Sequence, residues 1–238
     1  MKLTTALTVS VLLTAPLMSA QAQSPTGFAA ATRNNNLMYK VEITNITRGS
    51  LFTPILVASH RSGVSLFKLG EPASDELAML AEGGDIAPLN DVLLGDSDVV
   101  GTDHSEGLLE PGHSVTVYVP AGNANRISLA AMILPTNDGF IALNGVEVPR
   151  SGSQTFVVNG YDAGSEPNDE LCNSTFPMQS TIPGPGCGGM EGGISPEASG
   201  EGFVHIHAGI HGIGGVIAAD HDWRNPMAVV TVQKVQQP

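Results

Sequence analysis

Basic, aromatic and cysteine residues are scarce in this sequence, and long apolar runs are absent after residue 18. Lys and Arg total 10 against 23 Asp and Glu, and the resulting formal net charge of −13 repels phosphate backbones and anionic lipid. This charge argues against nucleic acid as a partner. No later segment approaches the ~18 uninterrupted apolar residues of a spanning helix, so the chain is not expected to cross a membrane. The acidic surface suits divalent cations and basic partners, or serves solubility alone.

The first 22 residues have the three parts of a secretory signal peptide. Lys2 supplies the positive n-region, residues 6–18 the apolar h-region and residues 19–22 a cleavage site of small residues. We therefore expect a soluble mature chain that is secreted, periplasmic or held at the cell surface. No cysteine lies near the cleavage site to carry a lipid anchor. Residues 23–36 have the small, polar, aperiodic composition of a linker, and residues 37–238 are expected to form one domain.

The two cysteines, Cys172 and Cys187, lie in one segment rich in Pro and Gly. An oxidising compartment favours a disulfide between them. In the chain-entropy model, closing a loop of about 15 residues contributes on the order of 3 kcal/mol. A metal site or a reactive thiol is the alternative.

Short segments with the pattern of β-strands follow one another along most of the chain. Residues 39–44 and 113–119 alternate apolar and polar side chains, whereas 54–60 and 127–134 are largely apolar runs. Asn144-Gly145 is a strong hairpin-turn signal. Further strands are expected at residues 140–148, 154–158, 203–207 and 227–235. About eight short strands separated by turn residues favour an all-β antiparallel sandwich or barrel.

One short helix is expected from Ser74 to about Glu82. Ser74 is a suitable N-cap, and Gly83-Gly84 would stop the helix. Its apolar face should pack on the sandwich through Leu77, Leu80 and Ala81. Residues 164–202 are rich in Gly, Pro, Ser and Asn and are expected to form a long surface loop.

Three acidic residues stand where strands end and turns begin: Asp138, Asp162 and Glu166. Ca²⁺ takes hard oxygen ligands from flexible loops, and carboxylates at loop tips of neighbouring strands can converge at one end of a sandwich. Judged by spacing alone, these residues are more typical of solvated turn carboxylates.

The segments around these residues resemble, in order, the spondin N-terminal domain of F-spondin, mindin and many exported bacterial proteins. Residues 39–45 resemble its opening strand, 53–60 its second block and 73–83 its helix. Residues 127–138 resemble its run into a Pro-Ser-Pro-Asp turn, and 162–165 its Asp-Ala-Gly-Thr motif.

This resemblance implies an antiparallel C2-like β-sandwich with a loop-bound calcium ion. The family's carboxylate ligands would fall on Asp138, Asp162 and Glu166. The third position is commonly Asp in the family, so Glu166 reaches farther, and Gly139 stands where the family has Trp. Both departures bear on the affinity for Ca²⁺.

Four histidines provide a rival hypothesis. His205 and His207 lie two apart on one strand, and His211 and His221 follow in Gly-rich turns. Such groups can bind Zn²⁺ or Cu²⁺. Residues 203–209 are similar to the His-X-His strands of copper/zinc superoxide dismutase and chordin-type domains, although no histidine follows His221 to complete the dismutase set. The alternative to a metal site is a group of polar strand-face histidines.

Other motifs point away from EF-hands and hydrolases. Asp96-Ser-Asp98 begins like an EF-hand loop, but Val100 and Gly107 stand where that loop needs oxygen ligands. The chain has no Gly-X-Ser-X-Gly or His-Glu-X-X-His motif, and one Trp and three Tyr are few for a carbohydrate-cleaving cleft.

The sequence therefore predicts an exported, non-catalytic, calcium-binding module for adhesion, matrix or surface interaction. Its partner would be an extracellular or surface protein or glycan. A His-dependent copper/zinc metalloprotein or oxidoreductase is the alternative.

Overall fold

The computed structural model describes residues 37–171 and 200–237. The predicted signal peptide, the predicted linker, Cys172 and Cys187 lie outside these residues. The described elements are, in chain order, β1 (Leu37–Asn45), β2 (Leu51–Phe52), β3 (Leu56–His60), α1 (Asp75–Gly83), α2 (Ala87–Gly95), β4 (Val99–His104), β5 (Ser114–Pro120), β6 (Arg126–Leu134), β7 (Gly139–Glu147), β8 (Ser153–Asp162), β9 (His205–Ile206), α3 (Ala218–His221) and β10 (Ala228–Gln236).

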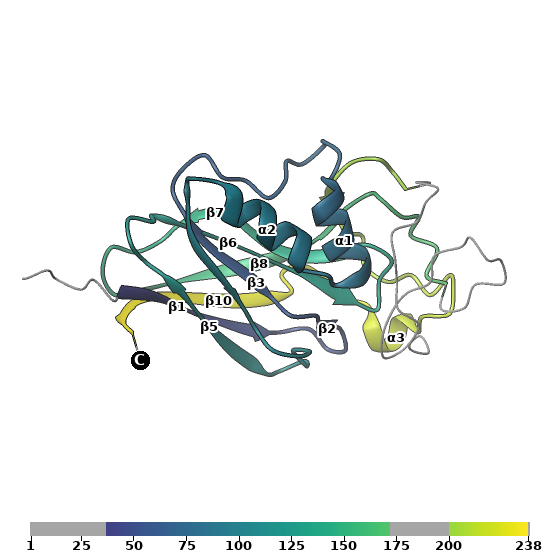
Figure 1. Cartoon of the computed structure of the whole chain (residues 1–238). Coiled ribbons are helices and arrows are strands. Elements are labelled where there is room, and N and C mark those ends of the chain that lie inside the picture. Colours follow the sequence, from purple (N-terminus) through teal and green to yellow (C-terminus); the bar gives the residue numbers. More distant parts are fainter. Residues whose placement is uncertain (1–36, 172–199, 238) are drawn as a thin grey trace, which may run out of the picture. The chain divides into compact units, whose positions relative to one another are not determined.

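All strand pairings are antiparallel, in the order β4-β3-β6-β7-β8-β10-β1-β5, with β2 paired to β6 and β9 to β8. The predicted all-β antiparallel fold is confirmed. The sheet folds over so that β1, β5 and β10 face β3, β6 and β7 across a shared apolar core. Figure 1 shows the two sets of strands with α1 and α2 above β3 and β6.

Strand β6 is buried on both faces, which explains its continuous apolar sequence. Ile127, Leu129, Ala131 and Ile133 point into the main core, while Ala130 joins a second cluster beneath α1 and α2. An exposed face would select polar residues at alternate positions, as in β1, whose buried Tyr39, Val41 and Ile43 alternate with more exposed residues.

Helix α1 agrees with its sequence signals. The Ser74 side chain accepts a hydrogen bond from the Leu77 backbone N–H at 3.2 Å, and Gly84 ends the helix in the left-handed conformation at φ 71°. Leu77, Leu80 and Ala81 are buried in the cluster that α1 shares with β3, β6 and β7.

The sequence predicted only α1, and the structure adds α2 and α3 among the described residues. The N-cap of α2, Ile86, makes no side-chain hydrogen bond, and the helix has no acidic residue in its first turn and no basic residue in its last, so its helical signals are weak. Strand β4 was also not foreseen, because Gly101 and the polar residues after it interrupt any alternation. No helix in the described ranges is long and apolar enough to cross a membrane.

Strand order determines where the acidic residues meet. The turn after β6 leads through Asp138 into β7, whose first residue, Gly139, pairs with Asp162 at the end of β8. Strand β9 then pairs with β8 so that His205 lies opposite Asp162. Residues far apart in sequence are therefore neighbours at one end of the sheet.

Candidate metal centre

Asp138 is a fully buried carboxyl group with one oxygen satisfied and the other not. Its Oδ2 accepts hydrogen bonds from Ser165 N at 2.7 Å, Ser165 Oγ at 3.2 Å and Glu166 N at 3.0 Å. Its Oδ1 is buried and has no hydrogen-bond partner among the described residues. An acceptor buried without a donor costs about 1–3 kcal/mol, so Oδ1 is an unsatisfied acceptor that a further ligand would stabilise.

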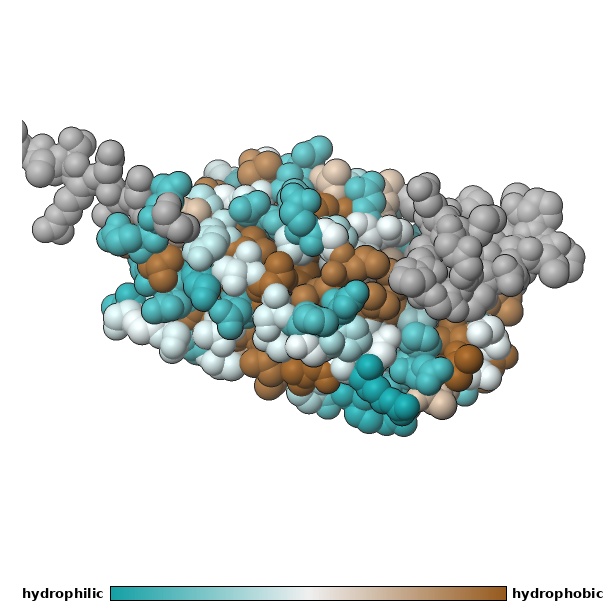
Figure 2. Space-filling model, turned by 90° about the horizontal axis from the view of Figure 1, so that it is seen from below, coloured by the Kyte–Doolittle hydropathy of each residue, from teal (hydrophilic) through white to brown (hydrophobic). Residues whose placement is uncertain are grey.

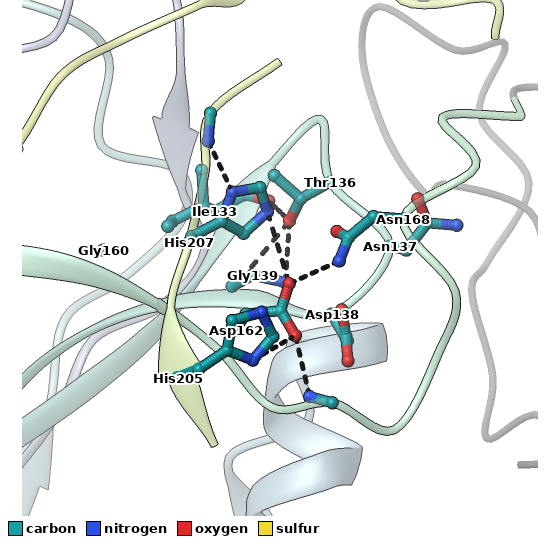
Figure 3. A network of polar contacts seen from close by, with 12 residues as sticks. Ile133, Thr136, Asn137, Asp138, Gly139, Gly160, Asp162, Asn168, His205 and His207 are labelled. Carbon is teal, nitrogen blue, oxygen red and sulfur yellow. Dashed lines mark hydrogen bonds and ion pairs between the residues drawn. The ribbon is translucent and has the colours of Figure 1, made fainter. Parts of the chain in front are cut away.

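Asp162 is equally buried and ends β8 beside Asp138. Its Oδ1 accepts from Gly164 N at 2.8 Å, and its Oδ2 accepts from the side-chain amide of Asn168 at 2.7 Å. Figure 3 shows Asn168, His205 and His207 arranged around this carboxylate, with Asp138 next to it. Asp162 thus lies at the centre of the polar network.

Electrostatics make this pair of carboxyl groups unfavourable in its charged form. Burial raises the pKa of Asp138 to about 7, and the negative charge of Asp162 adds to that increase, while the hydrogen bonds from Glu166 and Ser165 oppose it. Burial also raises the pKa of Asp162, against the stabilising effects of Asn168 and His205. A bound cation would remove the cost of ionising both groups.

Glu166 completes the trio predicted from the sequence. Its backbone N–H holds Asp138, and its side chain is 2% exposed. The structure therefore places all three predicted residues in buried positions: Asp138 in the turn before β7, Asp162 at the end of β8 and Glu166 in the loop after it. Asp138 and Glu166 are linked directly by a hydrogen bond, and Asp138 and Asp162 by their electrostatic interaction.

Sequence reasoning missed Glu82, a buried acidic residue of α1. It lines a pocket of about 410 Å³ together with Ser165, between α1 and the loop after β8. A charged residue in the last turn of a short helix is usually solvated, so its sequence position gave no signal of burial. Its position places a buried carboxyl group of α1 in the same pocket as Ser165, which donates to Asp138.

The histidines separate into different environments. His207 has a buried side chain whose Nδ1 accepts a hydrogen bond from Gly209 N at 3.0 Å, and burial lowers its pKa to about 4. His205 is partly exposed, and its Nδ1 lies 3.1 Å from the Phe203 carbonyl oxygen and 3.6 Å from Asp162 Oδ1. His221 instead contacts the Gly49 carbonyl oxygen at 2.9 Å.

Within the described ranges, one group of side chains has the spacing of metal ligands: Asp162, Glu201 and His205. Only one of the four histidines in the rival hypothesis belongs to it. Glu201 was not foreseen, since it follows a long aperiodic segment that gives no indication of where the chain returns.

A further buried carboxyl group, Glu170, is fully satisfied by the backbone. Its Oε1 accepts from His211 N, and its Oε2 accepts from Gly212 N at 2.7 Å and Ile213 N at 3.0 Å. Its own N–H donates to the side chain of Asn137 at 3.2 Å. Glu170 therefore links the Gly-rich segment after β9 to the acidic loops through hydrogen bonds.

Comparison with known protein families assigns most of the described chain to one family. The family model described as Spondin_N matches residues 41–181, more than half of the chain. The chain belongs to the Spondin_N family. The match includes Asp138, Asp162 and Glu166 and ends before Glu201 and His205. Spondin_N domains are extracellular interaction modules, which gives this chain its general role. No curated protein matches it.

Proposed function

We propose that this Spondin_N domain binds Ca²⁺ through Asp138, Asp162 and Glu166 and uses the ion to fix the loops that it presents to a partner. The observation that carries the proposal is the buried Oδ1 of Asp138, which finds no hydrogen-bond donor within residues 37–171 and 200–237 and lies beside a second buried carboxylate. Calcium takes 6–8 oxygen ligands in flexible geometry, so carboxylates, backbone carbonyls and water can share it. The residues present fit this ion.

The proposed role of the ion is structural and the domain is non-catalytic. Asp138, Asp162 and Glu166 are each at most 2% exposed, so a substrate would have no direct access to an ion held between them. Calcium at this position would join the turn before β7 to the loop after β8. It would order loops rather than activate a bound molecule.

The surface that these loops present suits a protein or glycan outside the cell or on its surface. Three apolar side chains in the chain segment that follows these loops are exposed: Ile213 at 68%, Ile217 at 61% and Phe203 at 41%. Figure 2 shows apolar patches interspersed with polar ones on one face of the molecule. A mixed surface of this kind is typical of non-obligate interfaces.

Thermal melts with calcium and with chelator test the proposal. At a hundredfold excess over Kd, binding to the native state alone contributes ~2.7 kcal/mol. For a domain of this size, that stabilisation raises Tm by roughly 5–10 °C at about 2–4 °C per kcal/mol. We expect Asp162→Ala to remain folded and to lose most of the rise.

The matched control is Asp91→Ala, which removes an exposed carboxylate from α2 and should keep the full calcium-dependent rise. An equal rise in wild type and Asp162→Ala would contradict the proposed site.

A further inference from the structure

Next to the proposed calcium site, three side chains form a group with mixed nitrogen and oxygen donors. One ligand atom from each of Asp162, Glu201 and His205 lies within 4.8 Å of the other two. Calcium prefers oxygen donors, whereas imidazole together with carboxylates suits Zn²⁺. Glu201 is exposed and His205 partly exposed, so an ion could reach this group from solvent.

The hydrogen bonds of Asp162 leave room for two cations. A carboxylate offers about four lone-pair sites. Gly164 N occupies one on Oδ1, and the Asn168 amide occupies one on Oδ2. One site therefore remains on each oxygen. Asn168 also donates to Glu201 at 3.2 Å and so holds the two carboxylates in fixed relation.

His207 supplies an independent observation that points to a ligand. Because Gly209 N donates to Nδ1, that nitrogen bears a lone pair, and the proton of the neutral ring lies on Nε2. The side chain is only 3% exposed, and Nε2 has no hydrogen-bond partner among the described residues. It faces Asp162, with Oδ2 3.9 Å away, too far for a hydrogen bond. A buried donor is thus aimed at this group without an acceptor.

We propose that Asp162, Glu201 and His205 bind a Zn²⁺ ion, that Asp162 is shared with the calcium site, and that a water on the zinc accepts the His207 Nε2–H. Three protein ligands and a water give the four-coordinate arrangement that zinc adopts in open sites. Asp162 and Glu201 balance the charge of the ion. In the described residues, neither carboxylate forms an ion pair with Lys or Arg.

The Zn²⁺ site does not depend on calcium binding, and one set of variants separates the two. Isothermal titration with Zn²⁺, in excess Ca²⁺ and on protein without a His-tag, should show one ion per chain. Asp138→Asn should lose the calcium-dependent rise in Tm and keep zinc binding. His205→Ala and Glu201→Gln should lose zinc binding and keep the calcium-dependent rise in Tm. Asp162→Ala should lose both the zinc binding and the rise.

The expected losses differ between ligands and the orienting histidine. His205→Ala and Glu201→Gln should weaken zinc binding by more than the about 10–100-fold that removal of an outer-shell partner costs. His207→Phe should weaken it by about 10–100-fold and keep the one-to-one stoichiometry. Substituted Co²⁺ should give a visible spectrum that His205→Ala abolishes.

The control is His113→Ala, which removes an exposed histidine paired with Glu110 at 3.6 Å and should leave the zinc titration unchanged. Preserved calcium-dependent melting of His205→Ala and Glu201→Gln would show that they are folded. Zinc affinity unchanged in both variants, or no Zn²⁺ binding by the wild type, would overturn the assignment.

Discussion

Asp138 and Glu170 are both buried carboxyl groups in neighbouring loops, yet backbone N–H groups donate to both oxygens of only one of them. Glu170 accepts backbone N–H groups on both oxygens, whereas Asp138 accepts all its donors on Oδ2. Charge-assisted hydrogen bonds of this kind stabilise a buried carboxylate in place. The hydrogen bonding of the Glu170 carboxylate is therefore complete, whereas Oδ1 of Asp138 has no donor among the described residues, as expected if it is a ligand of the proposed Ca²⁺ site.

The conformation of Glu170 supports this distinction. It is the one non-glycine residue with positive φ, at 55°, in the described part of the chain. The left-handed region is unfavourable for Glu, so its surroundings must impose it. Besides its side-chain contacts, its carbonyl oxygen accepts from Gly215 N at 2.7 Å. The backbone is held on both sides of the residue.

The largest loss of unfolding free energy should come from Glu170→Ala. Hydrogen bonds to charged groups contribute about 1.5–3 kcal/mol each, but the three donors lie near solvent and water would replace part of the loss, so we expect about 3 kcal/mol of destabilisation. The loss should be the same with calcium and with chelator in urea unfolding. Glu170→Gln keeps one acceptor oxygen and should lose less. A loss confined to calcium-loaded protein would place Glu170 in the ion site instead.

An effect of opposite sign is expected for Asp138→Asn in calcium-free protein. The pKa of Asp138 rises to about 7 in the folded state from an ordinary value of 3.8, so the folded chain holds an extra proton between these values. The unfolding free energy of the wild type should therefore fall, relative to the variant, as pH rises from about 4 to about 7. At pH 7 the difference in unfolding free energy between the variant and the wild type should be on the order of a few kcal/mol.

This comparison removes the contribution of titrating groups that lie away from Asp138, because they are present in both proteins, and it reports on Asp138 together with Asp162, whose charge interacts with it. His207, whose lowered pKa acts with the opposite sign, largely cancels in the difference. Urea unfolding of both proteins at intervals of pH, after removal of calcium, measures the gap. If the unfolding free energies of the two proteins changed in parallel with pH, the pKa of Asp138 would not be raised in the folded state. With calcium restored, the wild type should be the more stable of the two at pH 7.

The sequence was sufficient to predict most of the strands and to single out the acidic trio, but not β2, β4 or the contacts around the trio. The uninterrupted apolar run of β6 and the alternation of β1 directly reflect which faces are buried. Asp138 and Asp162 were singled out by the resemblance to the spondin N-terminal domain, since spacing alone is more typical of solvated turn carboxylates. Their pairing partners depend on register, which no local pattern specifies.

Residues on loops were harder to place. Asn168, Glu170 and Glu201 act through positions that irregular backbone gives them, and irregular backbone has no periodicity to indicate a partner. Glu82 was missed for the opposite reason, because a charge on a helix is ordinarily solvated. Burial of polar groups is a tertiary property, and it is what distinguishes the site from other acidic loops.

The smallest change in unfolding free energy is expected at Asp98, which is exposed where the other carboxyl groups are buried. It pairs with Arg61 at 2.7 Å, but both side chains are 41% exposed. Exposed pairs contribute about 0–1 kcal/mol and weaken with salt, because water solvates the separated charges nearly as well. Asp98→Asn should therefore lower the unfolding free energy by at most about 1 kcal/mol, less at high salt, in urea unfolding.

The same variant should keep the full calcium-dependent rise in Tm. Asp96 and Asp98 lie in the turn before β4 at the spacing that begins an EF-hand loop, and they are the exposed acidic pair with which Asp138 and Asp162 can be compared, although Val100 breaks the rest of that pattern. The difference between them is physical: Asp98 has an arginine and solvent, whereas Asp138 Oδ1 is buried with neither. If Asp98→Asn abolished the calcium response while Asp162→Ala kept it, the ion would bind at the exposed loop, and burial would not be what defines this site.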